Sequence, residues 1–74
     1  MSYYKDKQRA NIYLSGIINA IEESRREVNV SAVILEVTKK HAVSESGVLK
    51  RIEWIAENTK GMLLIDGVIK WAPK

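Results

Sequence analysis

The chain has 74 residues, which is enough for a single domain spanning 1–74. Twelve Lys and Arg against nine Asp and Glu leave a net charge of +3, a mildly basic balance that suits nucleic-acid contact without requiring it. The chain has no cysteine and a single histidine, which excludes disulfides and argues against zinc, so we expect no metal and no other cofactor.

A core this small rarely contributes more than about 3–5 kcal/mol of net stability. Because no disulfide can supplement it, we expect a homodimer or another partner. No apolar run approaches the roughly 18 residues of a membrane span, and Met1–Lys5 lacks an apolar signal core. We therefore expect no membrane span and an intracellular, cytoplasmic protein.

The first predicted element is a long amphipathic helix. Residues 1–5 are expected to be a flexible tail, Asp6 can cap the helix, and the helix should end near Arg26. Gly16 inside it is tolerated and could mark a close helix contact. Apolar residues recur at three-and-four spacing, which predicts a buried stripe of Ala10, Tyr13, Leu14, Ile17, Ile18 and Ile21.

Two short helices follow a short strand. The alternation at Val28–Val30 favours a strand, and Ser31 is a good N-cap for a helix over 32–41, with Val33, Ile34 and Val37 inward. After a turn at 41–43, Ser44 can cap a helix over 45–59, so that 32–59 forms a helix-turn-helix. One stripe of this last helix carries the residues expected in the core: Val48, Ile52, Ile55 and Ala56, with Leu49 at its edge.

A β-hairpin is predicted over 62–71. Gly61 is a plausible left-handed helix end, and Asp66-Gly67 suits a two-residue turn that needs positive φ. The turn sets the register and gives the hairpin two faces. The expected core face carries Met62, Leu64, Ile69 and Trp71; the other carries Leu63, Ile65, Val68 and Lys70. That second face is too apolar for a solvated surface, so we expect it to be covered.

The order helix, strand, helix, helix, strand, strand defines an α+β fold, and residues 37–52 resemble the helix-turn-helix of winged-helix DNA-binding proteins. The resemblance lies in Ala42 in the turn, the Val43-Ser44 pair, and the core positions Val48 and Ile52. It covers about 8–72 and implies a winged helix with the hairpin as its wing.

By this resemblance, the N-terminal half of helix 45–59 should approach base edges. The candidate DNA-binding residues are Lys39, Lys40, Ser44, Ser46, Gly47, Lys50 and Arg51. Ser46 can bond a base, Gly47 allows close backbone approach, and Lys50 can read guanine or pair with phosphate. Arg51 would favour phosphate from the flank, the amides at 44–46 form a positive helix end, and Lys39 and Lys40 can hold the backbone. Alternatively, these cations are ordinary solvated charges.

Two departures favour a protein interface instead. The hairpin tip is acidic and apolar, whereas a DNA-binding wing usually carries Lys or Arg near its tip. Trp54 falls on the stripe expected to be exposed, where it serves as an interface anchor or packs beneath Tyr3 or Tyr4. The alternative protein interface therefore comprises Trp54, Leu63, Ile65 and Val68.

Enzymatic chemistry is not expected. Ser44, His41 and Asp66 are residue types of a catalytic triad, but Ser44 already has a capping role and no nucleophile elbow accompanies it. The leading hypothesis is a sequence-specific double-stranded DNA-binding protein, a homodimeric transcriptional regulator that would be nucleoid-associated. The alternative is a winged-helix protein-interaction module, an accessory subunit of a replication, transcription or membrane-remodelling complex.

Overall fold

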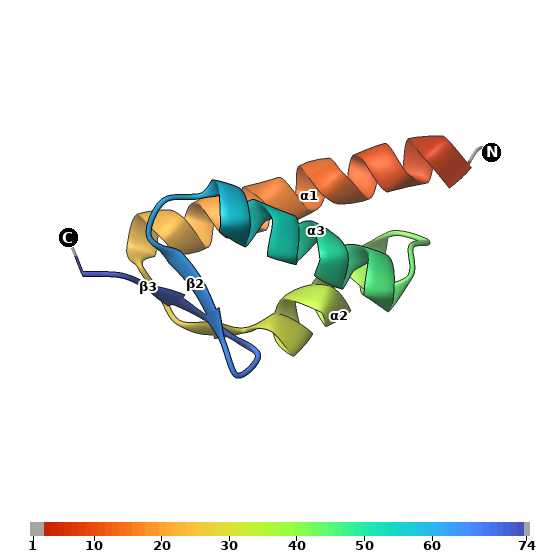
Figure 1. The fold of residues 1–74 in the computed structure, drawn as a ribbon. Helices are drawn as coiled ribbons and strands as arrows, with labels where there is room; N and C mark the ends of the chain where they lie inside the picture. Colours follow the sequence, from red (N-terminus) through yellow and green to blue (C-terminus); the bar gives the residue numbers. More distant parts are fainter. Residues whose placement is uncertain (1–2, 74) are drawn as a thin grey trace.

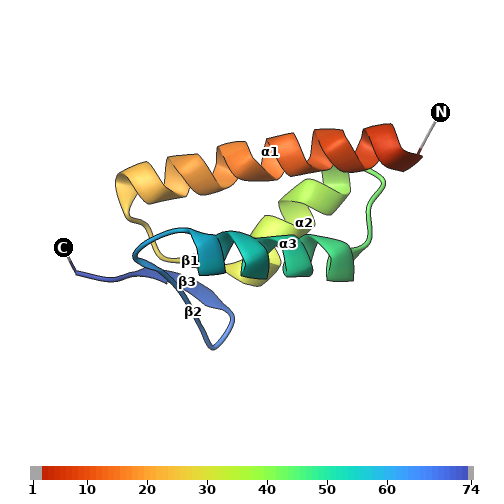
Figure 2. The same cartoon turned by 45° about the horizontal axis from the view of Figure 1, so that its top comes forward.

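The computed structural model describes the backbone of residues 3–73 and the side chains of residues 7–73. Its elements are α1 (Tyr3–Ser24), β1 (Val28–Asn29), α2 (Val30–Lys40), α3 (Glu45–Asn58), β2 (Met62–Ile65) and β3 (Val68–Trp71). The strands form one antiparallel sheet in the order β1-β3-β2. This is the predicted α+β fold with a winged-helix-like topology: α1 lies along one side of α2 and α3, and the hairpin projects from one end (Figures 1 and 2).

The first helix begins earlier than predicted, and its C-terminus adopts a motif that the local sequence does not predict. α1 already includes Tyr3, so the predicted flexible tail is wrong for residues 3–5, and the predicted N-cap at Asp6 is wrong because Asp6 lies inside the helix. Residues 1 and 2 lie outside the described range. After Ser24, Arg25 adopts a φ of 56°, the amide of Arg25 bonds the carbonyl of Glu22 and the amide of Arg26 bonds that of Ile21. This is a Schellman ending with arginine where glycine is usual.

The junction between β1 and α2 differs from the prediction. The strand ends at Asn29 and the helix starts at Val30, so Ser31 lies inside the first turn and is exposed rather than capping. The physical reason is that Val30 is buried and its N–H donates to the carbonyl of Gly67 at 2.8 Å. The wing thus satisfies a free amide at the start of α2, and a side-chain cap is not needed there.

The turn into α3 follows the prediction. Ser44 is the N-cap, and its Oγ accepts a hydrogen bond from the Gly47 amide at 3.1 Å. α3 ends at Asn58, one residue before the predicted end. Gly61 has a φ of 85° as expected, but it lies beyond the helix, in a turn closed by the Met62 amide and the Thr59 carbonyl.

The hairpin register is confirmed at every predicted pair, from Met62 opposite Trp71 to Ile65 opposite Val68. Asp66 and Gly67 have φ of 52° and 74°, as this two-residue turn requires. Met62 and Ile69 are buried and Leu64 and Trp71 pack against the core, which confirms the predicted core face. On the other face Leu63 and Ile65 are exposed.

The core lies where the three helices meet the inner face of the sheet. Its buried members are Ala10, Leu14, Ile18, Ile21, Val30, Val33, Val37, Val48, Ile52, Met62 and Ile69. Tyr13, Ile17, Ile55 and Ala56 were also predicted inward and pack against this cluster while half-buried. Within residues 3–73, no helix combines the length and apolarity needed to cross a bilayer.

Gly16 lies inside a helix and Gly67 lies in a turn with positive φ, so replacing each by alanine should change stability in opposite directions. Apart from its own local backbone, a Cβ at Gly16 or at Gly67 would meet no described atom within 4 Å, so the close helix contact suggested for Gly16 is not formed within the described chain. Gly16→Ala should raise the free energy of unfolding by about 0.5–1 kcal/mol, because alanine loses less backbone entropy in a helix.

Gly67→Ala should lower the free energy of unfolding by about 1–2 kcal/mol, because its φ of 74° is unfavourable for a residue with a Cβ. Urea unfolding of the two variants beside the parent measures both changes. A stabilising Gly67→Ala would mean that the turn in solution is not the one described.

Candidate nucleic-acid interface

The outer side of α3 is open to solvent. Val48 and Ile52 point into the core, and the side opposite them exposes Ser46, Gly47 and Lys50 in the N-terminal half. No described segment covers these residues. This rod, with one side buried and the other free, has the shape that a major groove accepts.

The start of α3 is a positive helix end that also carries an acidic residue. The Ser44 side chain satisfies the Gly47 amide and lies 3.5 Å from the Ser46 hydroxyl, oxygen to oxygen. Free amides at a helix start attract anions. Glu45 in the first turn is exposed and partly offsets this attraction, so a phosphate there needs support from neighbouring cations.

The two lysines at the end of α2 have different surroundings. Both are exposed, but the Lys40 Nζ lies 5.4 Å from the centre of the Tyr13 ring on α1. The Tyr13 hydroxyl in turn donates to the Glu36 carboxylate at 3.2 Å, and its ring lies 5.6 Å from that of His41. Lys40 therefore belongs to the contact between α1 and α2, whereas Lys39 is exposed at the end of the helix.

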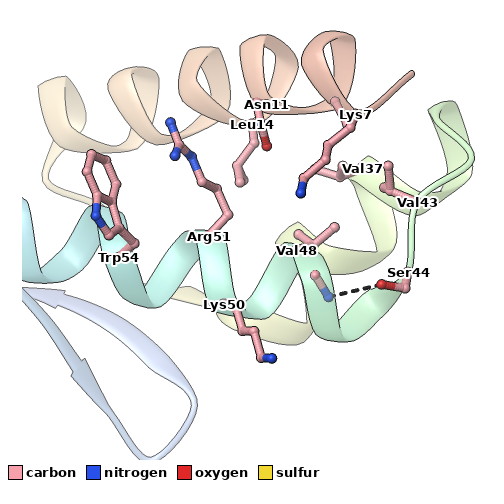
Figure 3. Close-up of a pocket in the computed structure, with 12 residues that line it drawn as sticks. Lys7, Asn11, Leu14, Val37, Val43, Ser44, Val48, Lys50, Arg51 and Trp54 are labelled. Carbon is pink, nitrogen blue, oxygen red and sulfur yellow. Dashed lines mark hydrogen bonds between the residues drawn. The ribbon is translucent and has the colours of Figure 1, made fainter. Parts of the chain in front are cut away.

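Arg51 lies apart from Lys50. Its guanidinium carbon is 4.6 Å from the centre of the Trp54 ring, and its side chain reaches toward α1, while Lys50 points away from α1 (Figure 3). Arg51 is only half-exposed, in contrast to Lys50. The candidate cations thus divide into an outward pair, Lys39 and Lys50, and two that are engaged by aromatic rings, Lys40 and Arg51.

One basic residue escaped the sequence reasoning. Lys7 lines a groove between α1 and α3 together with Asn11 and Arg51 (Figure 3). Its signal was present, because Lys7, Asn11 and Leu14 share one face of a helix at spacings of four and three. Lys7 fell inside the predicted first helix, but the resemblance assigned DNA contacts only to residues 39–51.

The alternative protein interface is also exposed. Trp54 is 52% exposed, and its suggested packing beneath Tyr3 or Tyr4 involves side chains outside the described residues. Leu63 and Ile65 are exposed and Val68 is half-buried. A second apolar area was not predicted: Leu35 and Leu49 are exposed beside a shallow hollow between the starts of α2 and α3.

Within the part of the chain that the structure describes, no cluster of three or more His, Asp or Glu side chains is placed to hold a metal ion. Comparison with known proteins found no matching family model, no similar curated protein and no similar solved structure. Function is therefore inferred from the geometry of α3 and its surroundings.

The two serines proposed as caps provide a matched test of how α3 is held. Ser44→Ala should lower the free energy of unfolding by about 1 kcal/mol, because the Gly47 amide loses its acceptor. Ser31→Ala should leave stability unchanged or slightly raised, since Ser31 is exposed within a helix and alanine is the better helix former. Thermal or urea unfolding measures both, and equal losses would contradict the described start of α2.

Proposed function

We propose that this protein binds double-stranded DNA as a homodimeric transcriptional regulator, with the N-terminal half of α3 in the major groove. The single observation that carries the proposal is the open outer side of α3, where Ser46, Gly47 and Lys50 face solvent opposite the buried Val48 and Ile52. Ser46 and the backbone at Gly47 are suited to base edges, and Lys50 to a guanine or a phosphate.

The distribution of charge supports this orientation. The N-terminal part of α1, the end of α2 and the start of α3 lie at the same end of the molecule (Figures 1 and 2). Lys7, Lys39 and Lys50 are exposed on these three segments. Glu53 and Glu57 are exposed further along α3, toward the hairpin. The three lysines therefore attract a polyanion to the start of α3 despite the exposed Glu45 there, and Glu53 and Glu57 repel it from the end of the helix.

The hairpin contributes differently from a DNA-binding wing. Asp66 at its tip is exposed, and Lys70, the only basic residue of the hairpin, is half-buried. Its exposed Leu63 and Ile65 suit contact with a second copy of the chain better than contact with phosphate. A two-fold dimer would double the few contacts that one α3 can make and would recognise a palindromic site.

Removing the outward pair of lysines tests the DNA-binding surface. Lys39→Gln combined with Lys50→Gln should weaken duplex binding about tenfold or more and reduce the slope of log K against log salt by about 2, one for each lost phosphate contact. Fluorescence anisotropy with a labelled duplex, titrated at several salt concentrations, measures both quantities.

The matched control removes two exposed cations from the opposite end of the molecule, Arg26→Gln with Lys60→Gln. It carries the same net charge as the test variant and should keep most of the affinity. Equal weakening by both pairs would indicate a response to net charge alone, and duplex binding unaffected by the test pair would end the assignment of this surface.

The second candidate function is a protein-interaction module, an accessory subunit of a larger complex. The observation that favours it is the exposure of Leu35, Trp54 and Ile65, which have 59%, 52% and 45% of their surfaces accessible. Negligible duplex affinity at low salt, together with loss of a partner on Trp54→Ala, would select this candidate over the first.

The dimer surface can be located with one charge placed on either of two exposed isoleucines. Ile65→Asp should convert the dimer to a monomer, because burying an unpaired carboxylate between two hairpins is costly. Ile12→Asp, on the outer side of α1, should leave the dimer intact. Sedimentation velocity at micromolar concentration distinguishes the two. Dissociation by Ile12→Asp alone would move the interface to α1, and a monomeric parent would refute the dimer.

A further inference from the structure

Apolar side chains and three cations line the groove between α1 and α3, and two of these cations, Lys7 and Arg51, extend into it while Lys50 points away from α1 (Figure 3). The groove has a cavity volume of about 310 Å³, and six of its twelve lining residues have apolar side chains: Val43 and Trp54 are accessible, and Ala10, Leu14, Val37 and Val48 are buried. Cavities of about 300–1,000 Å³ with apolar walls and a few convergent polar groups are typical of small-molecule sites. The size alone thus admits a ligand of one or two rings.

The charges in the groove have one sign. Lys7 from α1 and Arg51 from α3 extend into it from its two sides (Figure 3). The Asn11 amide is the neutral polar group between them, and none of the described lining residues is Asp or Glu. Among the described residues, the groove thus carries only positive charge beside an apolar surface, which is complementary to a molecule that is apolar at one end and anionic at the other.

Arg51 supplies an independent indication. Its Nε is closed to solvent and has no hydrogen-bond partner among the described residues, although the guanidinium rests on the Trp54 ring. A buried donor without an acceptor is unfavourable and rare. A carboxylate in the groove would provide acceptors in the fork geometry that guanidinium prefers, once the side chain turns outward from Trp54.

We propose that the groove between α1 and α3 is a binding site for a small amphipathic organic anion, with its ring against the apolar lining of the groove and its charge between Lys7 and Arg51. A bare inorganic anion would leave the apolar lining unused, and a neutral ring would leave both cations unpaired. The site lies beside the start of α3, so its occupant would restrain Arg51 next to the surface assigned above to DNA.

The test uses 8-anilinonaphthalene-1-sulfonate as an anionic probe and N-phenyl-1-naphthylamine as its neutral counterpart, with the intact chain and without DNA. The anionic probe should bind about tenfold more tightly than the neutral one, because charged hydrogen bonds contribute about that factor or more. In ¹⁵N-resolved spectra of the protein, the amide chemical shifts changed by the anionic probe should centre on Asn11, Gly47 and Arg51. Changes centred on Leu63–Ile65, or equal affinity for the two probes, would overturn the proposal.

Matched variants separate the groove from net charge. Lys7→Gln with Arg51→Gln should weaken binding of the anionic probe about tenfold or more. Arg9→Gln with Lys60→Gln removes one Arg and one Lys at exposed positions outside the groove and should leave affinity within about twofold of the parent. Equal weakening by both pairs would refute the site.

Lys7→Gln alone keeps the test decisive if the Arg51 variant fails to fold, because Lys7 is exposed on α1 and its loss leaves the core intact. Unchanged affinity for the anionic probe in Lys7→Gln would count against the site. Since the titrations contain no DNA, their failure leaves the proposed DNA binding standing, and failure of duplex binding leaves the groove site standing.

Discussion

The packing of the inner side of α3 onto α1, α2 and the sheet is the constraint on which the rest of the molecule depends. Val37, Ile52 and Ile69 are fully buried, and Leu14 is nearly so; these four side chains come from α2, α3, β3 and α1. A chain without disulfides must bury its few apolar stripes together in one cluster. Once Val48 and Ile52 are committed to that cluster, helix geometry leaves Ser46, Gly47 and Lys50 on the outside.

The same packing explains why the four cations predicted to bind DNA lie in different surroundings. Arg51 lies about 100° around α3 from both Lys50 and Ile52, which places it at the edge of the core facing α1 rather than on the outer side. There it stacks on Trp54 and borders the groove that Lys7 enters from α1. Lys40 is similarly drawn to Tyr13 at the contact between α1 and α2. Only Lys39 and Lys50, of the four predicted, point away from the helical core without an aromatic partner among the described contacts, so the surface proposed for DNA is narrower than the residue types alone suggest.

The hairpin completes the core on one face and leaves two large apolar side chains exposed on the other. Its inner face completes the core, and the carbonyl of Gly67 at its tip accepts from the Val30 amide, so the turn holds the start of α2 as well as joining two strands. At the end of the hairpin opposite the turn, the Trp71 Nε1 donates to the Arg26 carbonyl at 2.8 Å and the Arg25 guanidinium lies 5.6 Å from the Trp71 ring. The side chains of Leu63 and Ile65 take no part in these contacts and are exposed.

What the sequence by itself determined are the features encoded over a few neighbouring residues: the order of elements, the Ser44 cap, the Asp66-Gly67 turn with its register, and the apolar stripes of the helices. These follow from backbone dihedral preferences, local hydrogen bonds and residue spacing, which act within one element or one turn. Tertiary structure decided the rest. The start of α2 at Val30, the contact of Lys40 with Tyr13 and the groove that Lys7 shares with Arg51 all depend on partners distant in the chain. No local pattern specifies which distant carbonyl will accept an amide or which ring will attract a cation, because those contacts exist only after the core has brought the elements together.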